Sequence, residues 1–168
     1  RLKAQYDEIK NQEEYIRFLA ERDFLTDLYN RRKLSMNLEE SIKSGKNGTI
    51  ILIDIDDFKN INDTLGHYYG DKVLKYVSRL VSSITFFEEY TPYRIGGDEF
   101  VLICFDMDEK IFRSKVRDIC DSIAAKRISV SVGVVWEESS SELETMLRRA
   151  DDLMYAEKKK YYEEHGTM

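Results

Sequence analysis

One nearly continuous apolar run, "TIILIDID" at residues 49–56, limits the fold of this chain more than any other feature of its sequence. β-Branched and aliphatic residues at almost every position are typical of a central strand that is buried on both faces. The chain has 168 residues, which suffice for one domain with its own core and one additional helix. We therefore expect a single domain built around this strand.

The remaining periodic segments set the order of the elements. Helical spacing of apolar residues predicts helices over residues 31–43, 71–84 and 109–125, and alternation predicts a strand in "ISVSVGVVW". The segments "YRI" and "FVLICF" flank Gly96-Gly97, which predicts a hairpin with a tight glycine turn. A capping box of Ser141 and Glu144 predicts the start of a last helix. The order β-α-β-β-α-β plus a terminal helix indicates an α+β fold, a ferredoxin-like, mainly antiparallel sheet with helices on one face.

Residues 1–22 contain no Gly or Pro and are predicted to form a charged N-terminal helical linker before a domain at residues 23–168. Leu2, Ile9 and Ile16 recur every seven residues, but Gln5 and Gln12 occupy the companion positions of the repeat. Two interpretations stay open at this point, a solvated connecting helix and a dimerising helix. In either case we expect a monomer or a weak dimer for the isolated segment.

Composition and charge exclude several classes of function. The net charge of -6 argues against a general nucleic-acid-binding protein, which would carry a basic surface. The longest apolar runs are too short to span a membrane, so we expect no membrane contact by this segment. The chain begins at Arg1 rather than Met, and we interpret it as part of a longer protein. Cys104 and Cys120 lie in apolar patterns and are expected to be free thiols.

Two carboxylate clusters stand at strand ends. "DIDDF" places Asp54, Asp56 and Asp57 where the buried strand ends, and "GGDEF" places Asp98 and Glu99 just after the hairpin turn. If the hairpin pairs beside the central strand, Asp54 and Asp98 converge. Carboxylates that close repel one another, and a hard divalent cation such as Mg²⁺ resolves the conflict.

Each of these clusters also has a simpler explanation. Acidic pairs at strand ends are common, and either cluster taken alone is more typical of a polar turn. An EF-hand calcium loop is excluded, because Lys59 stands where that loop needs Gly and Leu65 where it needs Glu.

Five segments in this order resemble the GGDEF-domain diguanylate cyclases, from about Asp23 to Lys158. They are "DFLTDLYNRR", "DIDDFKNINDTLGHYYGD", "RIGGDEF", "ISVSVGV" and "RRADDLMYAEK". The resemblance implies the palm fold of nucleotidyl cyclases. It also implies a reaction in which two GTP molecules condense into cyclic di-GMP with release of pyrophosphate.

The resemblance also implies a metal site and catalytic residues. Asp54, the backbone carbonyl of Ile55, Asp98 and Glu99 would hold Mg²⁺ or Mn²⁺. Asp98 would in addition accept the proton of the ribose 3′-hydroxyl, Glu99 would orient that hydroxyl, and Lys59 would stabilise the phosphates or the developing charge. Metal charge and positioning supply most of the stabilisation in phosphoryl transfer.

Substrate-binding residues follow from the same resemblance. Asn62 and Asp71 match residues that contact the guanine edge, with His67 in the same pocket. A carboxylate accepts hydrogen bonds from guanine N1–H and N2–H, whereas adenine presents an acceptor at N1 and would leave the charge unpaired. The phosphates would be bound by the residues matching the family's phosphate-binding positions: the backbone amides of Asp57 and Phe58 and the side chain of Lys158.

The sequence departs from the family pattern in two places. Where the family continues with Gly-Arg-Asn after the phosphate-binding lysine, this chain has Tyr161, Tyr162 and Glu163, so the second phosphate cation is missing. Upstream of the signature, residues 87–90 read "FEEY" in place of the Arg-x-x-Asp that binds the product and inhibits the enzyme. We therefore expect weaker GTP binding or turnover, and no product inhibition through that site.

The leading hypothesis from sequence is an active diguanylate cyclase that works as an antiparallel homodimer under an upstream sensor domain. Its expected location is the cytoplasm, either free or as the cytoplasmic part of a membrane-anchored sensor. The alternative is a catalytically weakened GGDEF domain that binds GTP or a protein partner. A pure scaffold would leave Asn62, Asp71 and Asp98 without a purpose.

Overall fold

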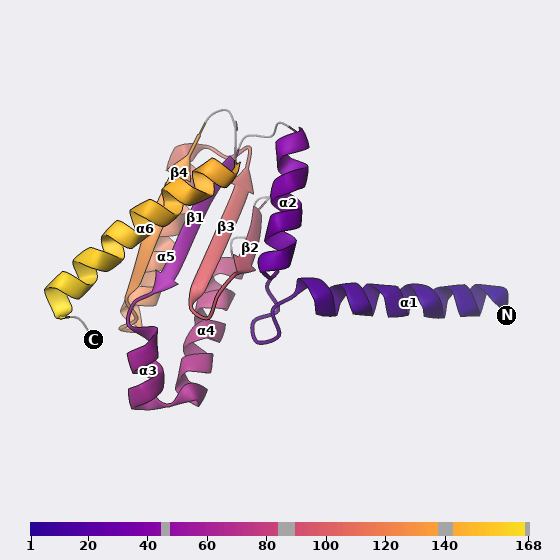
Figure 1. Cartoon of the computed structure of the whole chain (residues 1–168), viewed down its shortest axis with the longest axis horizontal. Helices are drawn as coiled ribbons and strands as arrows, with labels where there is room; N and C mark the ends of the chain where they lie inside the picture. Colours follow the sequence, from indigo (N-terminus) through magenta and orange to yellow (C-terminus); the bar gives the residue numbers. More distant parts are fainter. Residues whose placement is uncertain (45–47, 84–89, 138–142, 167–168) are drawn as a thin grey trace.

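The computed structural model describes residues 1–44, 48–83, 90–137 and 143–166, and of residues 41–44 the backbone alone. The elements, in chain order, are α1 (Leu2–Glu21), α2 (Arg31–Ser44), β1 (Gly48–Ile55), α3 (Phe58–Leu65), α4 (His67–Ser82), β2 (Tyr90–Arg94), β3 (Glu99–Phe105), α5 (Glu109–Ala125), β4 (Val130–Trp136) and α6 (Leu143–His165). Figure 1 shows the sheet between layers of helices, with α1 projecting away from it.

The sheet has the strand order β2-β3-β1-β4, and β1 pairs antiparallel with both of its neighbours. Every residue of β1 is buried, which confirms the prediction of a central strand covered on both faces. The alternating burial of β4 confirms that strand as well. The order and directions of the strands are those of the ferredoxin-like fold predicted from the sequence.

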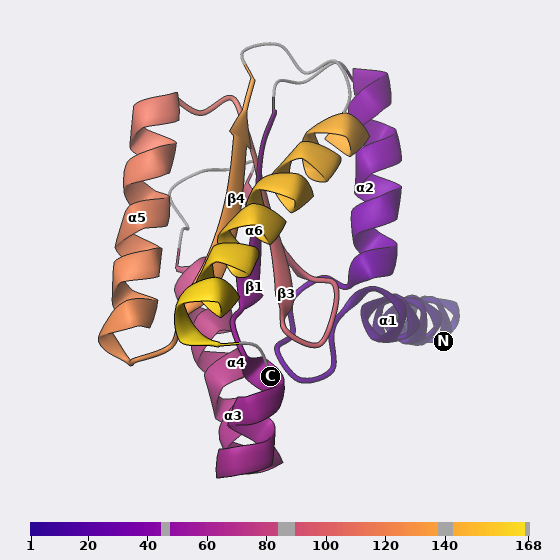
Figure 2. The same ribbon diagram turned by 60° about the vertical axis from the view of Figure 1, so that its left-hand side comes forward.

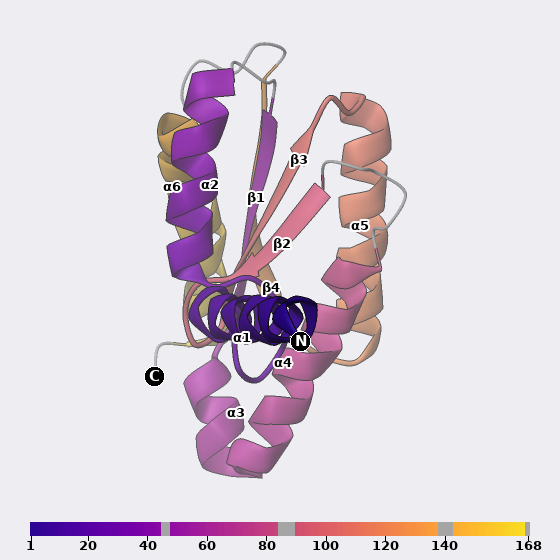
Figure 3. The same cartoon turned by 90° about the vertical axis from the view of Figure 1, so that its right-hand side faces the viewer.

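Helices cover both faces of the sheet, not one. On the first face, α4 and α5 pack against Ile51, Ile53 and Phe100. On the second face, α2 and α6 pack against Ile50, Leu52 and neighbouring residues of the hairpin (Figure 3). The expectation of helices on one face was wrong because it considered only the two crossover helices. The helices before β1 and after β4 also have apolar faces that need burial.

Gly66 separates α3 from α4, and α3 extends beyond one end of the sheet together with the beginning of α4 (Figure 2). Its φ of 88° lies in the left-handed region, where a side chain would be strained. This break lets the chain reverse its direction, so that the Asn62 side chain lies against the backbone of α4 at Gly70.

The helix α1 has no buried residue and stands apart from the sheet (Figure 1). Its heptad residues are all exposed, namely Leu2, Ile9 and Ile16. This exposure is compatible both with a dimerising helix and with a solvated connecting helix. None of the helices that the structure describes is both long and apolar enough to cross a membrane.

The predicted β2–β3 hairpin is confirmed, but its turn is wider than a tight glycine turn. Arg94 pairs with Phe100, and the Ile95 amide donates to the Glu99 carbonyl at 3.0 Å, with Gly96, Gly97 and Asp98 between them. Neither glycine of this loop has a positive φ. A Cβ atom at Gly96 would lie 2.9 Å from the Glu99 carboxylate, a contact that this flexible side chain can relieve by moving.

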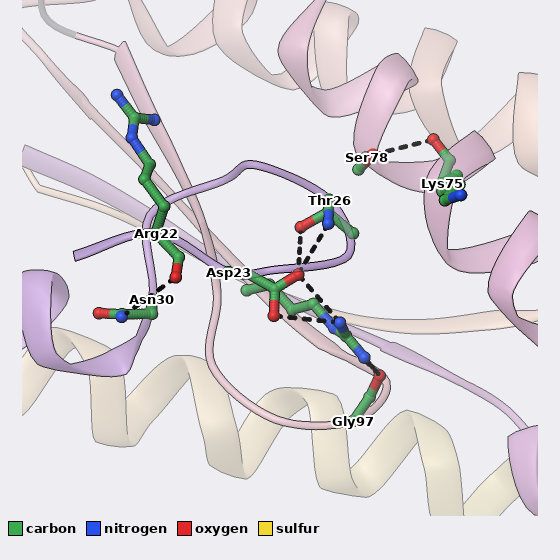
Figure 4. Close-up of polar contacts among 8 residues, drawn as sticks. Arg22, Asp23, Thr26, Asn30, Lys75, Ser78 and Gly97 are labelled. Carbon is green, nitrogen blue, oxygen red and sulfur yellow. Dashed lines mark hydrogen bonds and ion pairs between the residues drawn. The ribbon is translucent and has the colours of Figure 1, made fainter. Parts of the chain in front are cut away.

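An ion pair fixes this loop against the segment between α1 and α2. The Arg94 guanidinium donates to Asp23 Oδ2 at 2.9 Å and to the Gly97 carbonyl at 2.8 Å. Thr26 donates to the same Asp23 oxygen from its backbone N–H at 2.9 Å and from its hydroxyl at 2.7 Å (Figure 4). These contacts hold the pKa of Asp23 below its usual value although burial opposes them. Arg94 of β2 therefore fixes the position of Gly97, the residue directly before Asp98.

The structure also tests the predicted helix bounds and the predicted state of the cysteines. The helix predicted over residues 109–125 has the same bounds in the structure, and Cys104 and Cys120 are free thiols. The helix predicted over residues 71–84 begins earlier, at His67. Ser141 of the predicted capping box and Ile84 of the predicted helix lie outside the described residues.

Candidate active site

The two carboxylate clusters meet at the end of the sheet where β1 ends and the hairpin loop begins. Asp54 is the register partner of Glu99, and the Ile55 amide donates to the Asp98 carbonyl at 3.1 Å. The carboxylates of Asp54 and Asp98 are close enough to interact, because Asp98 adds to the rise in the pKa of Asp54. The convergence expected from the sequence is present, and it depends on the antiparallel pairing of β1 with β3.

Lys158 of α6 reaches into this site across the sheet face. Its ammonium lies 3.0 Å from Asp54 Oδ1 and 3.5 Å from the carbonyl oxygen of Ile55. The same helix packs on β1 and β4 through Met146, Ala150 and Met154, at intervals of four residues. This spacing carries Lys158 to the end of β1.

The electrostatics of the site are those of an anionic cluster that lacks enough positive charge. Burial raises the pKa of Asp54 to about 7; the Lys158 ion pair opposes this rise and the neighbouring Asp98 adds to it. Burial and Asp98 also raise the pKa of Glu99. Burial alone would lower the pKa of Lys158, but pairing with Asp54 outweighs it and raises that pKa. A bound cation would relieve the repulsion among the three carboxylates.

The donor set at this position fits a magnesium ion. Among the described residues, no three His, Cys, Asp or Glu side chains are grouped tightly enough to form a complete metal cage. Mg²⁺ does not need one, because it takes one or two carboxylates, retains water and binds substrate phosphates. Asp54, Asp98 and the carbonyl of Ile55 supply hard oxygen ligands of this kind. Their assignment as ligands stays a prediction.

Glu99 faces a different environment from Asp98. Its side chain lines a cavity of about 300 Å³ between α2 and α6, together with Arg31, Arg148 and Asp151. Arg31 also donates to the carbonyl of Ile95 at 3.1 Å, so it lies over the loop that carries the signature. The predicted roles of Glu99 in metal binding and in orienting the hydroxyl stay predictions.

Asp56 is turned away from this cluster and has a structural role. Its carboxylate accepts hydrogen bonds from the hydroxyls of Ser129 at 2.7 Å and Ser131 at 2.5 Å, and its amide donates to the Ser129 carbonyl. Asp56 therefore ties the end of β1 to the start of β4. The sequence grouped it with Asp54 and Asp57, and only the pairing with β4 separates them.

The residues predicted to contact guanine lie on α3 and α4. Asn62 is half-buried against Gly70, which directly precedes Asp71 in α4. Asp71, His67 and Lys59 are exposed on these helices. The structure therefore brings Asn62 beside the turn of α4 that carries Asp71, and the guanine and phosphate roles of these four residues stay predictions.

The predicted phosphate cradle lies at the start of α3. Asp57 has a positive φ of 57° and precedes the first helical residue, Phe58. The Asp57 amide is not free, because it donates to the hydroxyl oxygen of Tyr162 at 3.3 Å. The sequence identified Tyr162 only as a replacement for an arginine, and no sequence signal indicated this contact between residues 105 positions apart.

A family model described as "Diguanylate cyclase, GGDEF domain" matches residues 20–163. Diguanylate cyclase VdcA of Vibrio cholerae is 33% identical over an alignment of 148 residues, and the match covers 81% of this chain and 43% of that protein. Response regulator PleD of Caulobacter vibrioides is 35% identical over an alignment of 170 residues, and the match covers 90% of this chain and 37% of that protein. This chain therefore spans less than half the length of these two relatives.

Solved structures agree with the fold. The coiled coil and GGDEF domain of DgcB from Caulobacter crescentus, in complex with c-di-GMP, matches with a TM-score of 0.82 and 26% identity over 94% of this chain and 90% of that one. Diguanylate cyclase SiaD from Pseudomonas aeruginosa, in complex with its activator SiaC, matches with a TM-score of 0.75 and 26% identity over 95% of this chain and 66% of that one. The order of the elements, the acidic signature at the sheet end and these similarities agree: the chain belongs to the GGDEF family of diguanylate cyclases.

Proposed function

We propose that this domain is an active, magnesium-dependent diguanylate cyclase that condenses two GTP molecules into cyclic di-GMP and releases pyrophosphate. The observation that carries the proposal is the meeting of Asp54 and Asp98, from two separate segments, beside the ammonium of Lys158. Burial and the neighbouring Asp98 raise the pKa of Asp54, and a perturbed carboxylate beside other charged groups supports its place in a functional site.

The reaction needs two bond exchanges, each an attack of a ribose 3′-hydroxyl on the α-phosphorus of the other GTP, with pyrophosphate leaving. Mg²⁺ at Asp54, Asp98 and the Ile55 carbonyl would offset the negative charge of the triphosphate and polarise its phosphorus. Asp98 would accept the hydroxyl proton, and Lys158 would contribute a positive charge. Asn62 and Asp71 select guanine by accepting its N–H groups.

Each domain holds one GTP, so the chemistry requires two domains facing each other in antiparallel orientation. We propose a homodimer for catalysis, with α1 as the lever by which an upstream sensor domain controls the encounter. The exposed Leu2, Ile9 and Ile16 on a helix without buried residues support this role. GTP and Mg²⁺ are available in the cytoplasm, and we place the domain there, with no role for nucleic acid.

Product inhibition through an Arg-x-x-Asp site is not part of this proposal. Residues 87–90 carry neither the arginine nor the aspartate, and residues 87–89 lie outside the described part of the structure. We expect the initial rate to stay constant when micromolar cyclic di-GMP is added. A rate that falls with micromolar affinity for the product would show that this expectation is wrong.

The second candidate is a domain that binds GTP or a protein but turns over slowly. The contact of Tyr162 with the Asp57 amide favours it, because this contact occupies part of the predicted phosphate cradle. A magnesium-dependent assay with GTP at high enzyme concentration separates the two candidates. Formation of cyclic di-GMP that is lost in Asp98→Ala supports the cyclase, and intact GTP binding without product supports the binding domain.

A further inference from the structure

The last turn of α6 contacts the start of α3 through one side chain. Lys158 pairs with Asp54 at 3.0 Å, and Tyr162, one helical turn later, accepts a hydrogen bond from the Asp57 amide at 3.3 Å. In Figure 2 the C-terminal part of α6 runs down toward α3 at the end of the sheet, in agreement with this contact. Two consecutive turns of one helix face therefore contact two neighbouring parts of the same anionic site.

The Asp57 amide is a group to which we expect a phosphate oxygen to bind. Amides at the start of a helix point outward without an intrahelical partner and attract anions. Asp57 does not cap α3 with its own side chain, and its Oδ1 atom is buried without a hydrogen-bond partner among the described residues. The Tyr162 hydroxyl is thus the group that accepts the hydrogen bond of this amide.

Neighbouring side chains hold the Tyr162 ring in this place. The Lys158 ammonium lies 5.9 Å from the centre of the ring, and the ring of Tyr161 meets it edge-on with the two centres 5.5 Å apart. Tyr162 itself is only partly exposed. The hydroxyl is therefore presented to the amide by a packed ring and not by a freely rotating side chain.

We propose that Tyr162 is a competitor built into the phosphate subsite: its hydroxyl occupies the position of a phosphate oxygen on the Asp57 amide and must leave before the triphosphate binds. The inference rests on the proposed function, since it assumes that this subsite receives the triphosphate of GTP. One N–H group donates well to one acceptor at a time, so the hydroxyl and the phosphate exclude each other. Tyr162 then sets the affinity for GTP.

The test uses Tyr162→Phe, which removes the hydroxyl and keeps the ring that packs against Lys158 and Tyr161. The ligand is the α,β-methylene analogue of GTP with Mg²⁺, which cannot be turned over, and calorimetry measures its Kd. Loss of one competing hydrogen bond is expected to tighten binding by about three- to tenfold. Tyr155→Phe is the matched control, because Tyr155 is an exposed tyrosine on the same helix, and its Kd should not change.

A second measurement reports on the contact without any ligand. The amide resonance of Asp57 in a ¹H–¹⁵N spectrum should shift in Tyr162→Phe and stay in place in Tyr155→Phe. Equal binding of the analogue by wild type and Tyr162→Phe, or weaker binding by Tyr162→Phe, overturns this inference alone. Absence of binding by both proteins overturns the proposed function and this inference with it.

Discussion

Replacing Asp98 by Asn should stabilise the protein in the absence of metal while it abolishes catalysis. Asn has the shape of Asp without the charge, so the substitution removes the repulsion between Asp98 and Asp54. Two unit charges about 4 Å apart repel by about 1 kcal/mol in water and about 4 kcal/mol at the effective dielectric constant near a protein surface. Lys158 offsets part of this repulsion, and we expect the free energy of unfolding to rise by about 1–2 kcal/mol.

The gain in the free energy of unfolding of Asp98→Asn should increase as the pH rises. The pKa of Asp54 is raised to about 7, so between about pH 4 and pH 7 the folded protein binds a proton that the unfolded chain does not. The metal-free wild type therefore loses stability as the pH rises through this range. At pH 5 Asp54 is protonated and Asp98→Asn should gain little, whereas at pH 8 the full gain should appear.

Thermal unfolding in EDTA at pH 5 and pH 8 measures this effect. For a domain of this size, about 1 kcal/mol corresponds to about 2–4 °C in Tm. The control is Asp118→Asn, an exposed aspartate of α5 on the opposite face of the sheet, which should leave Tm unchanged. Mg²⁺ and a GTP analogue should stabilise the wild type more than Asp98→Asn. An Asp98→Asn variant that unfolds at a lower temperature than wild type at pH 8 would refute the reasoning.

Three further substitutions test the positions around the site. Tyr162→Arg restores a cation one turn after Lys158, and charge-assisted hydrogen bonds to phosphate should lower the Kd for the GTP analogue by about tenfold or more, as measured by calorimetry. Gly70→Ala would place a methyl group onto the side-chain oxygen of Asn62, so KM for GTP should rise by about tenfold while Tm changes little; an unchanged KM would remove Asn62 from the guanine pocket. Gly133→Ala would overlap the backbone of α6 at Ala150 and push that helix away from β4. It should cost about 1–3 kcal/mol in urea unfolding and also lower kcat, because α6 carries Lys158.

The fold could be predicted from the sequence where one residue pattern had one structural solution. The apolar run of β1 had no alternative to a doubly covered strand, and the amphipathic spacing of α5 gave its bounds without error. The pattern could not show which face α2 and α6 cover. Their apolar stripes fit either face, and only the packing of residues such as Leu34 and Met146 into the core cluster that also contains Tyr93 decides it.

The site was predictable in part for the same reason. Asp54 and Asp98 lie at fixed ends of strands that had to pair, so their convergence followed from the fold. Asp56 looked equivalent to Asp54 in the sequence, but its position two residues later places it beside Ser129 and Ser131. The Tyr162 contact with Asp57 joins two elements that no sequence pattern relates, and it depends on the length and direction of α6.

The most direct test of the account is to locate a metal ion. Crystals grown with Mn²⁺ and the α,β-methylene analogue of GTP would show the ion by its anomalous scattering. We predict a peak bound to the carboxylates of Asp54 and Asp98, the carbonyl of Ile55 and an oxygen of the triphosphate. A nucleotide bound elsewhere, or an ion that contacts neither Asp54 nor Asp98, would contradict the account.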